Sequence, residues 1–123
     1  MLKISLLVVI AVVLFVSMRA FGRSSEQDPA TAFAKIAQGA TVIDVRTAEE
    51  FAAGHLPEAH NIPYEQIIAG VEKLNIGKDQ PVVVYCRSGH RAGIAKTALE
   101  KSGYTQIYNA GGLQKLQAFK QKN

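Results

Sequence analysis

The stretch VVVYCRSGHRAG, residues 82–93, contains the only cysteine of the chain. Its first residues, 82–86, are β-branched, aromatic or small and do not alternate with polar residues, which is typical of a buried parallel strand. The residues after Gly93 favour a helix. We therefore expect Cys86 between the carboxyl end of a strand and the amino end of a helix, where unpaired backbone N–H groups and the helix dipole face the sulfur.

This position favours the thiolate form of Cys86, because Arg87 and Arg91 add positive charge beside the backbone N–H groups. The sulfur is then a candidate nucleophile toward an anionic substrate. The alternative is a small, buried, unreactive residue, which is the common role of an isolated cysteine. An inert thiol has no need of two arginines, a glycine and a histidine directly after it, and burying those charges around it costs free energy.

The composition is that of one domain. The chain has 123 residues with ordinary glycine, proline and charged fractions, and it shows no internal repeat. Residues 1–23 hold three of the 14 basic residues and no acidic one, so the remainder carries 11 basic and 10 acidic residues, a net charge of +1. It has no basic stripe with interleaved aromatic residues, and no nucleic-acid partner is expected.

Residues 4–18 (ISLLVVIAVVLFVSM) carry no charge and lie between Lys3 and Arg19. A helix of this length spans roughly 22 Å, short of the ~30 Å hydrocarbon core of a membrane. The length suits the apolar region of a signal peptide, with cleavage possible after Gly22. The alternative is an uncleaved anchor that contacts the membrane through residues 2–21. We expect a signal peptide or anchor at 1–22, a linker at 23–28 and a domain at 29–123.

The basic residues around the apolar segment are nearly balanced, with Lys3 before it and Arg19 and Arg23 after it. A short, early segment favours translocation of the remainder. The expected location is therefore the periplasm or the outer face of a bacterial inner membrane, and an anchored domain facing the cytoplasm is the alternative.

Strands and helices alternate along the rest of the chain. This pattern predicts an α/β fold, a single domain with a mainly parallel central sheet of about five strands and helices on both faces. Thr47 with Glu50 is a capping box that begins one helix. Ligands bind at the carboxyl ends of strands in such sheets, where Cys86 and residues 44–46 fall. Strands are expected at 41–45, 60–62, 82–86 and 106–108, and helices at 30–38, 47–53, 64–74, 92–102 and 112–121.

Three stretches of the sequence resemble the rhodanese family of sulfurtransferases, and together they span residues 41–116. They are IDVRTAEEF (43–51) with GHLP (54–57) and NIP (61–63), then YCRSGHRA (85–92), then NAGGL (109–113). The sequence departs from the family at Glu58, where many members have glycine, at His60, where an apolar residue is usual, and at Leu116, where tryptophan is frequent. These departures concern turn geometry and packing and leave the cysteine loop intact.

The resemblance implies a rhodanese fold and a thiosulfate sulfurtransferase. The Cys86 thiolate attacks the outer sulfur of thiosulfate, sulfite leaves, and a thiophilic acceptor such as cyanide or a thiol takes the sulfur from the Cys86 persulfide. Backbone N–H groups of residues 87–91 stabilise the anions. A protein is a further candidate acceptor, and a monomer is expected. The resemblance implies a substrate-binding loop of Arg87 and Arg91, which hold the sulfonate, with Ser88, Gly89, and His90, which hydrogen-bonds the anion or gates access.

Asp44 and Arg46 are expected to support the site. Asp44 at a strand end is a candidate for a charged hydrogen bond to the Cys86 loop, in preference to a role as general base. Arg46 is expected to pair with an acid such as Glu50 or to line the mouth of the pocket. Cys86 and His90 are too few soft ligands for a zinc site, so neither metal nor cofactor is expected.

Three other functions stay open. A phosphatase of the cell-division-cycle type, which shares the fold, has Cys-x5-Arg, one residue longer than the Cys-x4-Arg of residues 86–91. A persulfide carrier or redox-sensing interaction module would turn over thiosulfate slowly. A silent, anchored interaction domain would not need the intact Cys86 and its two arginines.

Overall fold

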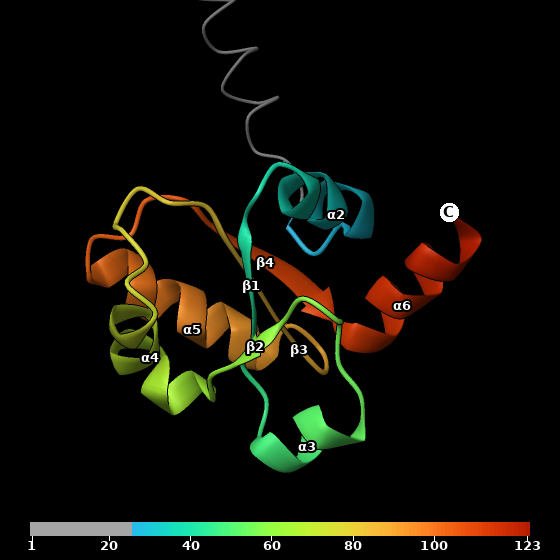
Figure 1. Cartoon of the computed structure of the whole chain (residues 1–123), viewed down its shortest axis with the longest axis horizontal. Helices are drawn as coiled ribbons and strands as arrows, with labels where there is room; N and C mark the ends of the chain where they lie inside the picture. The colour runs from blue at the N-terminus through green and yellow to red at the C-terminus, as the bar shows by residue number, and fades with distance from the viewer. Residues whose placement is uncertain (1–25) are drawn as a thin grey trace, which may run out of the picture.

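The structure is a computed structural model that describes residues 26–123 (Figure 1). The signal peptide or anchor expected at 1–22 and the start of the linker lie outside the described residues. Within 26–123, every helix is too short or too polar to cross a membrane.

Helices and strands alternate along the described chain, as the sequence predicts. Proline and an aspartate cap begin the first helix, because Asp28 accepts a hydrogen bond from the Thr31 N–H while Pro29 occupies the first helical turn. The elements are α2 (Pro29–Ala37), β1 (Thr41–Asp44), α3 (Ala48–Ala53), β2 (His60–Asn61), the 3₁₀ turn η1 (Tyr64–Gln66), α4 (Ile67–Lys73), β3 (Val82–Cys86), α5 (His90–Lys101), β4 (Ile107–Gly112) and α6 (Leu113–Lys122).

The strands form one parallel sheet in the order β2-β1-β3-β4. The α/β fold is therefore confirmed, but the prediction of about five strands is wrong for the described residues, which hold four. The physical reason is that no further strand-length segment remains. Residues 29–37 fold into α2, and residues 74–81, which include Gly77 and Pro81, form turns.

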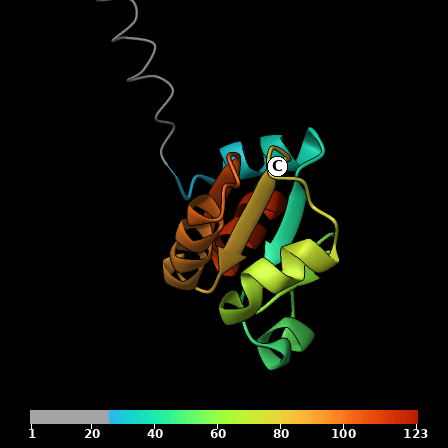
Figure 2. The ribbon, with the colours of Figure 1, turned by 90° about the vertical axis from the view of Figure 1, so that its left-hand side faces the viewer.

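Helices cover both faces of the sheet, as Figure 2 shows. Successive side chains of β3 point to opposite faces, so the apolar run of residues 82–86 serves two cores. On one face Val82, Val84 and Cys86 pack with residues of α4 and α5. On the other face Val83 and Tyr85 pack with residues of α2 and α6.

Two boundaries differ from the sequence expectation in ways that matter for the site. Helix α5 begins at His90 rather than at residue 92, because the positive φ of 95° at Gly89 turns the chain directly into the helix. Strand β4 continues to Gly112 rather than ending at residue 108, and Gly112 pairs with Cys86. The carboxyl end of β4 therefore lies beside the reactive loop.

Candidate active site

Cys86 is the last residue of β3 and is fully buried. The Gly89 N–H donates a hydrogen bond to its Sγ over 3.0 Å. This contact is possible because Gly89 adopts the left-handed conformation that L side chains rarely adopt, which folds the backbone back over the sulfur. The expected placement of the cysteine between a strand and a helix is confirmed, and a backbone donor faces the sulfur.

Asn109 of β4 connects the reactive loop to the neighbouring strand. Its Nδ2 donates to the Gly89 carbonyl over 2.9 Å, and its Oδ1 accepts from the Gly111 N–H over 2.9 Å. The Asn109 side chain is buried, and both its amide N–H donor and its carbonyl acceptor are hydrogen-bonded. One amide therefore fixes the turn at Gly89 and the turn at Gly111. The sequence offered a signal for this residue, because Asn109 belongs to the stretch NAGGL that resembles the rhodanese family, but its long-range partner Gly89 is visible only in the fold.

Gly112 lies against the loop more closely than any side chain would allow. A Cβ at this position would stand 2.3 Å from the carbonyl oxygen of Arg87. The absence of a side chain at Gly112 therefore permits the backbone of β4 to approach the Cys86 loop. Gly111 supplies the turn itself with a φ of 84°.

Arg91 forms a bidentate ion pair with Glu50, with Nη1–Oε1 at 2.7 Å and Nη2–Oε2 at 3.0 Å. The Arg91 hydrogen bonds, reinforced by those from Thr47, lower the pKa of Glu50 to about 2. Glu50 belongs to the predicted capping box with Thr47, which is confirmed at the start of α3. Its partner is Arg91, so Glu50 is not the acid with which Arg46 pairs.

Arg46 pairs instead with Asp44, which lies two residues before it in the sequence. Its Nε lies 2.9 Å from Oδ1 and its Nη2 2.6 Å from Oδ2, and its backbone N–H also donates to Oδ1. This pairing raises the pKa of Arg46. A further bond from Nη2 to the Gly54 carbonyl ties the end of β1 to the end of α3. The Asp44 carboxylate, expected to hold the Cys86 loop, thus accepts hydrogen bonds from three donor groups of Arg46.

Arg87, Ser88 and His90 are exposed at the rim of the loop. Arg87 makes no ion pair with any described residue. It lines a cavity of about 330 Å³ together with Arg46 and Glu50, and a second of about 280 Å³ beside Gly112. The alternative expectation, that Arg46 lines a cavity at the site, is therefore consistent with the structure, while the substrate-binding roles of the loop residues stay predictions.

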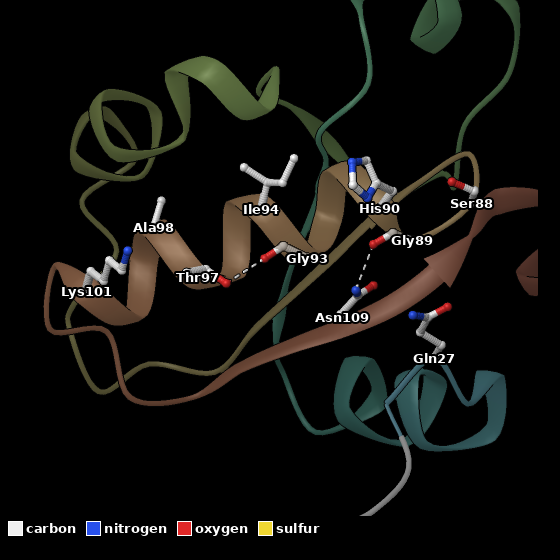
Figure 3. A pocket seen from close by; sticks show the side chains of 10 residues that line it. All are labelled: Gln27, Ser88, Gly89, His90, Gly93, Ile94, Thr97, Ala98, Lys101 and Asn109. Atoms are coloured by element: carbon white, nitrogen blue, oxygen red, sulfur yellow. Dashed lines mark hydrogen bonds between the residues drawn. The ribbon is translucent and has the colours of Figure 1, made fainter.

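A larger cavity of about 770 Å³ lies along α5 (Figure 3). Ser88, Gly89 and His90 of the reactive loop form one end of it, and Asn109 and Gln27 lie beside them. Within residues 26–123, no three His, Cys, Asp or Glu side chains gather as a metal ion would require. The cavity of about 280 Å³ beside Gly112 is lined by basic, amide and glycine residues and by no carboxylate, a lining that suits an anion.

Comparisons with known proteins agree with this geometry. The family model of the rhodanese-like domain matches residues 28–119. The chain is 44% identical to the uncharacterized protein YqhL of Bacillus subtilis over 73 residues, which are 59% of this chain and 56% of that protein. It is 39% identical to the thiosulfate sulfurtransferase PspE of Escherichia coli over 71 residues, 58% of this chain and 68% of that protein.

A solved structure described as a rhodanese with anions from E. coli is 37% identical to the chain. It superimposes with a TM-score of 0.59 over 62% of this chain and 89% of that one. The chain thus spans little more than half of YqhL but most of this single-domain structure. By its sequence, its parallel sheet and the position of its cysteine loop, the chain belongs to the rhodanese-like domain family.

Proposed function

We propose that the protein is a sulfurtransferase that moves the outer sulfur of thiosulfate, or of a similar anionic donor, through a persulfide on Cys86. The observation that carries this proposal is the Gly89 N–H directed at Sγ over 3.0 Å in a loop that Asn109 and Gly112 hold in place. The thiosulfate sulfurtransferase name of PspE, at 39% identity, supports the choice of donor.

In the first step the Cys86 thiolate attacks the outer sulfur of thiosulfate. A bond forms between the two sulfurs, the S–S bond of thiosulfate breaks, and sulfite leaves with the electron pair. Backbone N–H groups of the loop stabilise the charge that develops on the transferred sulfur. We assign Arg87 to the sulfonate of thiosulfate, because its guanidinium is exposed and forms no ion pair among the described residues. The Arg91 guanidinium is already paired with the Glu50 carboxylate.

In the second step an acceptor removes the sulfur. With cyanide, a C–S bond forms, the S–S bond of the persulfide breaks, and the electron pair returns to Sγ as the thiolate. Over the two steps the electrons gained and lost are equal, so the cycle as written needs no external oxidant or reductant.

The experiment is intact-mass measurement before and after incubation with thiosulfate. Wild-type protein gains one sulfur, about 32 Da, and the Cys86→Ser variant gains none. Subsequent addition of cyanide restores the original mass and releases thiocyanate. Wild-type protein whose mass does not change in thiosulfate contradicts the proposal.

A persulfide carrier with slow thiosulfate turnover is the second candidate. It is favoured by the complete burial of Cys86 and by the Glu50 carboxylate, which offsets the charge of Arg91. Steady-state rates distinguish the two functions. A carrier gains sulfur from other donors, such as polysulfide, faster than from thiosulfate, while a thiosulfate sulfurtransferase does not.

We also propose that the domain is exported, as a secreted or anchored periplasmic protein. The support is the uncharged run of residues 4–18 between Lys3 and Arg19. Cell fractionation and amino-terminal sequencing of protein isolated from cells test this, and full-length protein in the cytoplasmic fraction contradicts it.

A further inference from the structure

Residues 26–28, the described segment before α2, lie beside the reactive loop and are attached to the elements around it. The Gln27 N–H donates a hydrogen bond to the Asn109 carbonyl over 2.7 Å. Glu26 forms an ion pair with Lys96 of α5. The segment is therefore joined to β4 and to α5, the helix that follows the reactive loop.

The side chain of Gln27 covers Gly89, the residue whose N–H donates to Sγ of Cys86. Figure 3 shows it directed from the segment before α2 toward Gly89 and Asn109. A Cβ at Gly89 would meet all three terminal amide atoms of Gln27, with Oε1 at 2.7 Å, Cδ at 2.9 Å and Nε2 at 3.1 Å. Since a C–C single bond is about 1.5 Å long, Oε1 lies within about 4.2 Å of the Gly89 Cα, which is van der Waals contact.

The same side chain contacts Gly111, the other glycine with a positive φ beside the loop. A Cβ at Gly111 would lie 3.2 Å from the Cβ of Gln27. Gly89 and Gly111, with φ of 95° and 84°, are also the two residues whose backbone groups bind the Asn109 amide. Gln27 therefore packs on both of the turns that the buried Asn109 side chain holds by hydrogen bonds.

Gln27 itself has a φ of 65°, a left-handed conformation that a residue with a side chain adopts at a cost in free energy. Among the non-glycine residues of the described chain, Asn75 is the other one with a positive φ. Glycine would fit the backbone at position 27 without strain. A glutamine here therefore accepts backbone strain, and its side chain gains the contact with the loop.

We propose that Gln27 is a positioning residue for the first step of sulfur transfer. Its side chain restricts the turn at Gly89 to the conformation in which the N–H meets Sγ of Cys86. Glycine has the widest backbone freedom of all residues, and Asn109 holds its carbonyl. Gln27 restrains the same residue at the Cα. This inference rests on the proposed function, since the N–H of that turn stabilises the charge on sulfur.

The variant Gln27→Gly isolates the side chain, because it keeps the backbone N–H and suits the positive φ. We expect the rate of sulfur gain at saturating thiosulfate to fall about fivefold, as for partial loss of a hydrogen bond to a charged group. The KM for thiosulfate stays near that of wild type. The urea midpoint also stays near that of wild type, because glycine relieves strain in the folded state and adds freedom to the unfolded chain. A merely structural role would lower the midpoint and leave the rate unchanged.

Two further variants serve as rescue and control. Methionine is similar to glutamine in length and has no amide, so Gln27→Met fills the space over Gly89 and restores most of the rate. Asn75→Gly makes the glycine substitution at the other positive φ, 58°, just after α4, and keeps the wild-type rate. A wild-type rate in Gln27→Gly, or a loss in Gln27→Met equal to that in Gln27→Gly, overturns the proposal.

Hydrogen exchange of the Gly89 amide, followed by NMR without any sulfur donor, separates this inference from the proposed function. We expect exchange at Gly89 about fivefold faster in Gln27→Gly than in wild type, because exchange follows local opening of the turn. The amide of Leu99, buried in α5, exchanges equally in both proteins and is the internal control. Faster exchange at Gly89 supports the role of Gln27 even if thiosulfate adds no mass to the protein. Unchanged exchange at Gly89 overturns it even if sulfur transfer itself is observed.

Discussion

Asn109 donates a hydrogen bond to the carbonyl oxygen of Gly89 over 2.9 Å and so fixes the turn whose N–H reaches Sγ of Cys86. The two residues are 20 positions apart in the sequence and meet because β3 and β4 are neighbours in the sheet. The same side chain accepts from Gly111, so strand β4 and the reactive loop are held as one unit.

Replacing Asn109 with leucine should impair both stability and activity. The substitution leaves the Gly89 carbonyl and the Gly111 N–H without partners in a buried position, which costs about 1–3 kcal/mol for each group. We expect a lower urea midpoint and a slower gain of sulfur from thiosulfate. Gln106→Leu removes an exposed amide directly before β4 and serves as the control. Equal sulfur-loading rates in the Asn109 variant and wild type would contradict a role in positioning the loop.

The Gly112→Ala substitution should disable the site by displacement of the Arg87 carbonyl. The φ of −105° at Gly112 suits any residue, so the effect comes from the predicted 2.3 Å contact and not from backbone strain. We expect a loss of sulfur transfer of at least tenfold, measured as the rate of thiocyanate formation. Gly77→Ala, where the added Cβ meets atoms only at 3.5 Å, is the matched control and should keep full activity.

Glu50→Gln should destabilise the protein in a pH-dependent way. Because ion pairing lowers the pKa of Glu50 in the folded state from 4.5 to about 2, its stabilising contribution is fully present above pH 4.5 and is lost as the pH falls through about 2. The difference in the free energy of unfolding between wild type and variant should therefore shrink from pH 6 to pH 2.

Urea unfolding at several pH values measures this difference, and Glu49→Gln, one residue earlier in the first turn of α3, is the control. A Glu50→Gln difference that stays constant between pH 6 and pH 2 would show that the ion pair with Arg91 does not stabilise the fold.

Arg87 and Arg91 should differ in what their removal affects. Arg87 is exposed and unpaired among the described residues, so Arg87→Ala is expected to raise the KM for thiosulfate about tenfold while the urea midpoint stays near that of wild type. Arg91→Ala leaves Glu50 without its partner and should lower the midpoint as well. Steady-state kinetics with thiosulfate and cyanide, together with urea unfolding, distinguish the roles of the two arginines. A wild-type KM for thiosulfate in the Arg87→Ala variant would contradict a role of Arg87 in binding the donor.

Local sequence patterns predict much of this fold. The apolar run of residues 82–86 and the capping box of Thr47 and Glu50 each act over a few residues, and each appears in the structure where it was expected. The family resemblance rests on three such stretches and is confirmed by the match over residues 28–119. The placement of Cys86 at a strand end follows from the same local signals.

The ion pairs could not be predicted in the same way, because a sequence shows which ionic side chains exist but not which of them are in contact. Arg46 had three candidate acids within four residues, Asp44, Glu49 and Glu50. Only the fold shows that Asp44 is its partner and that Glu50 turns toward Arg91, 41 positions away.

The amino acid sequence by itself therefore determined the alternation of strands and helices and a single cysteine at a strand-to-helix junction, because these depend on short-range propensities and periodicity. Its three motifs indicated the family by resemblance. The tertiary structure alone decided that Asn109 and Gly112 lie against the Cys86 loop, that Arg91 pairs with Glu50, and that a cavity of about 770 Å³ lies along α5. These relationships depend on which strands become neighbours, and the burial of two apolar faces of one parallel sheet settles that only when the whole domain packs.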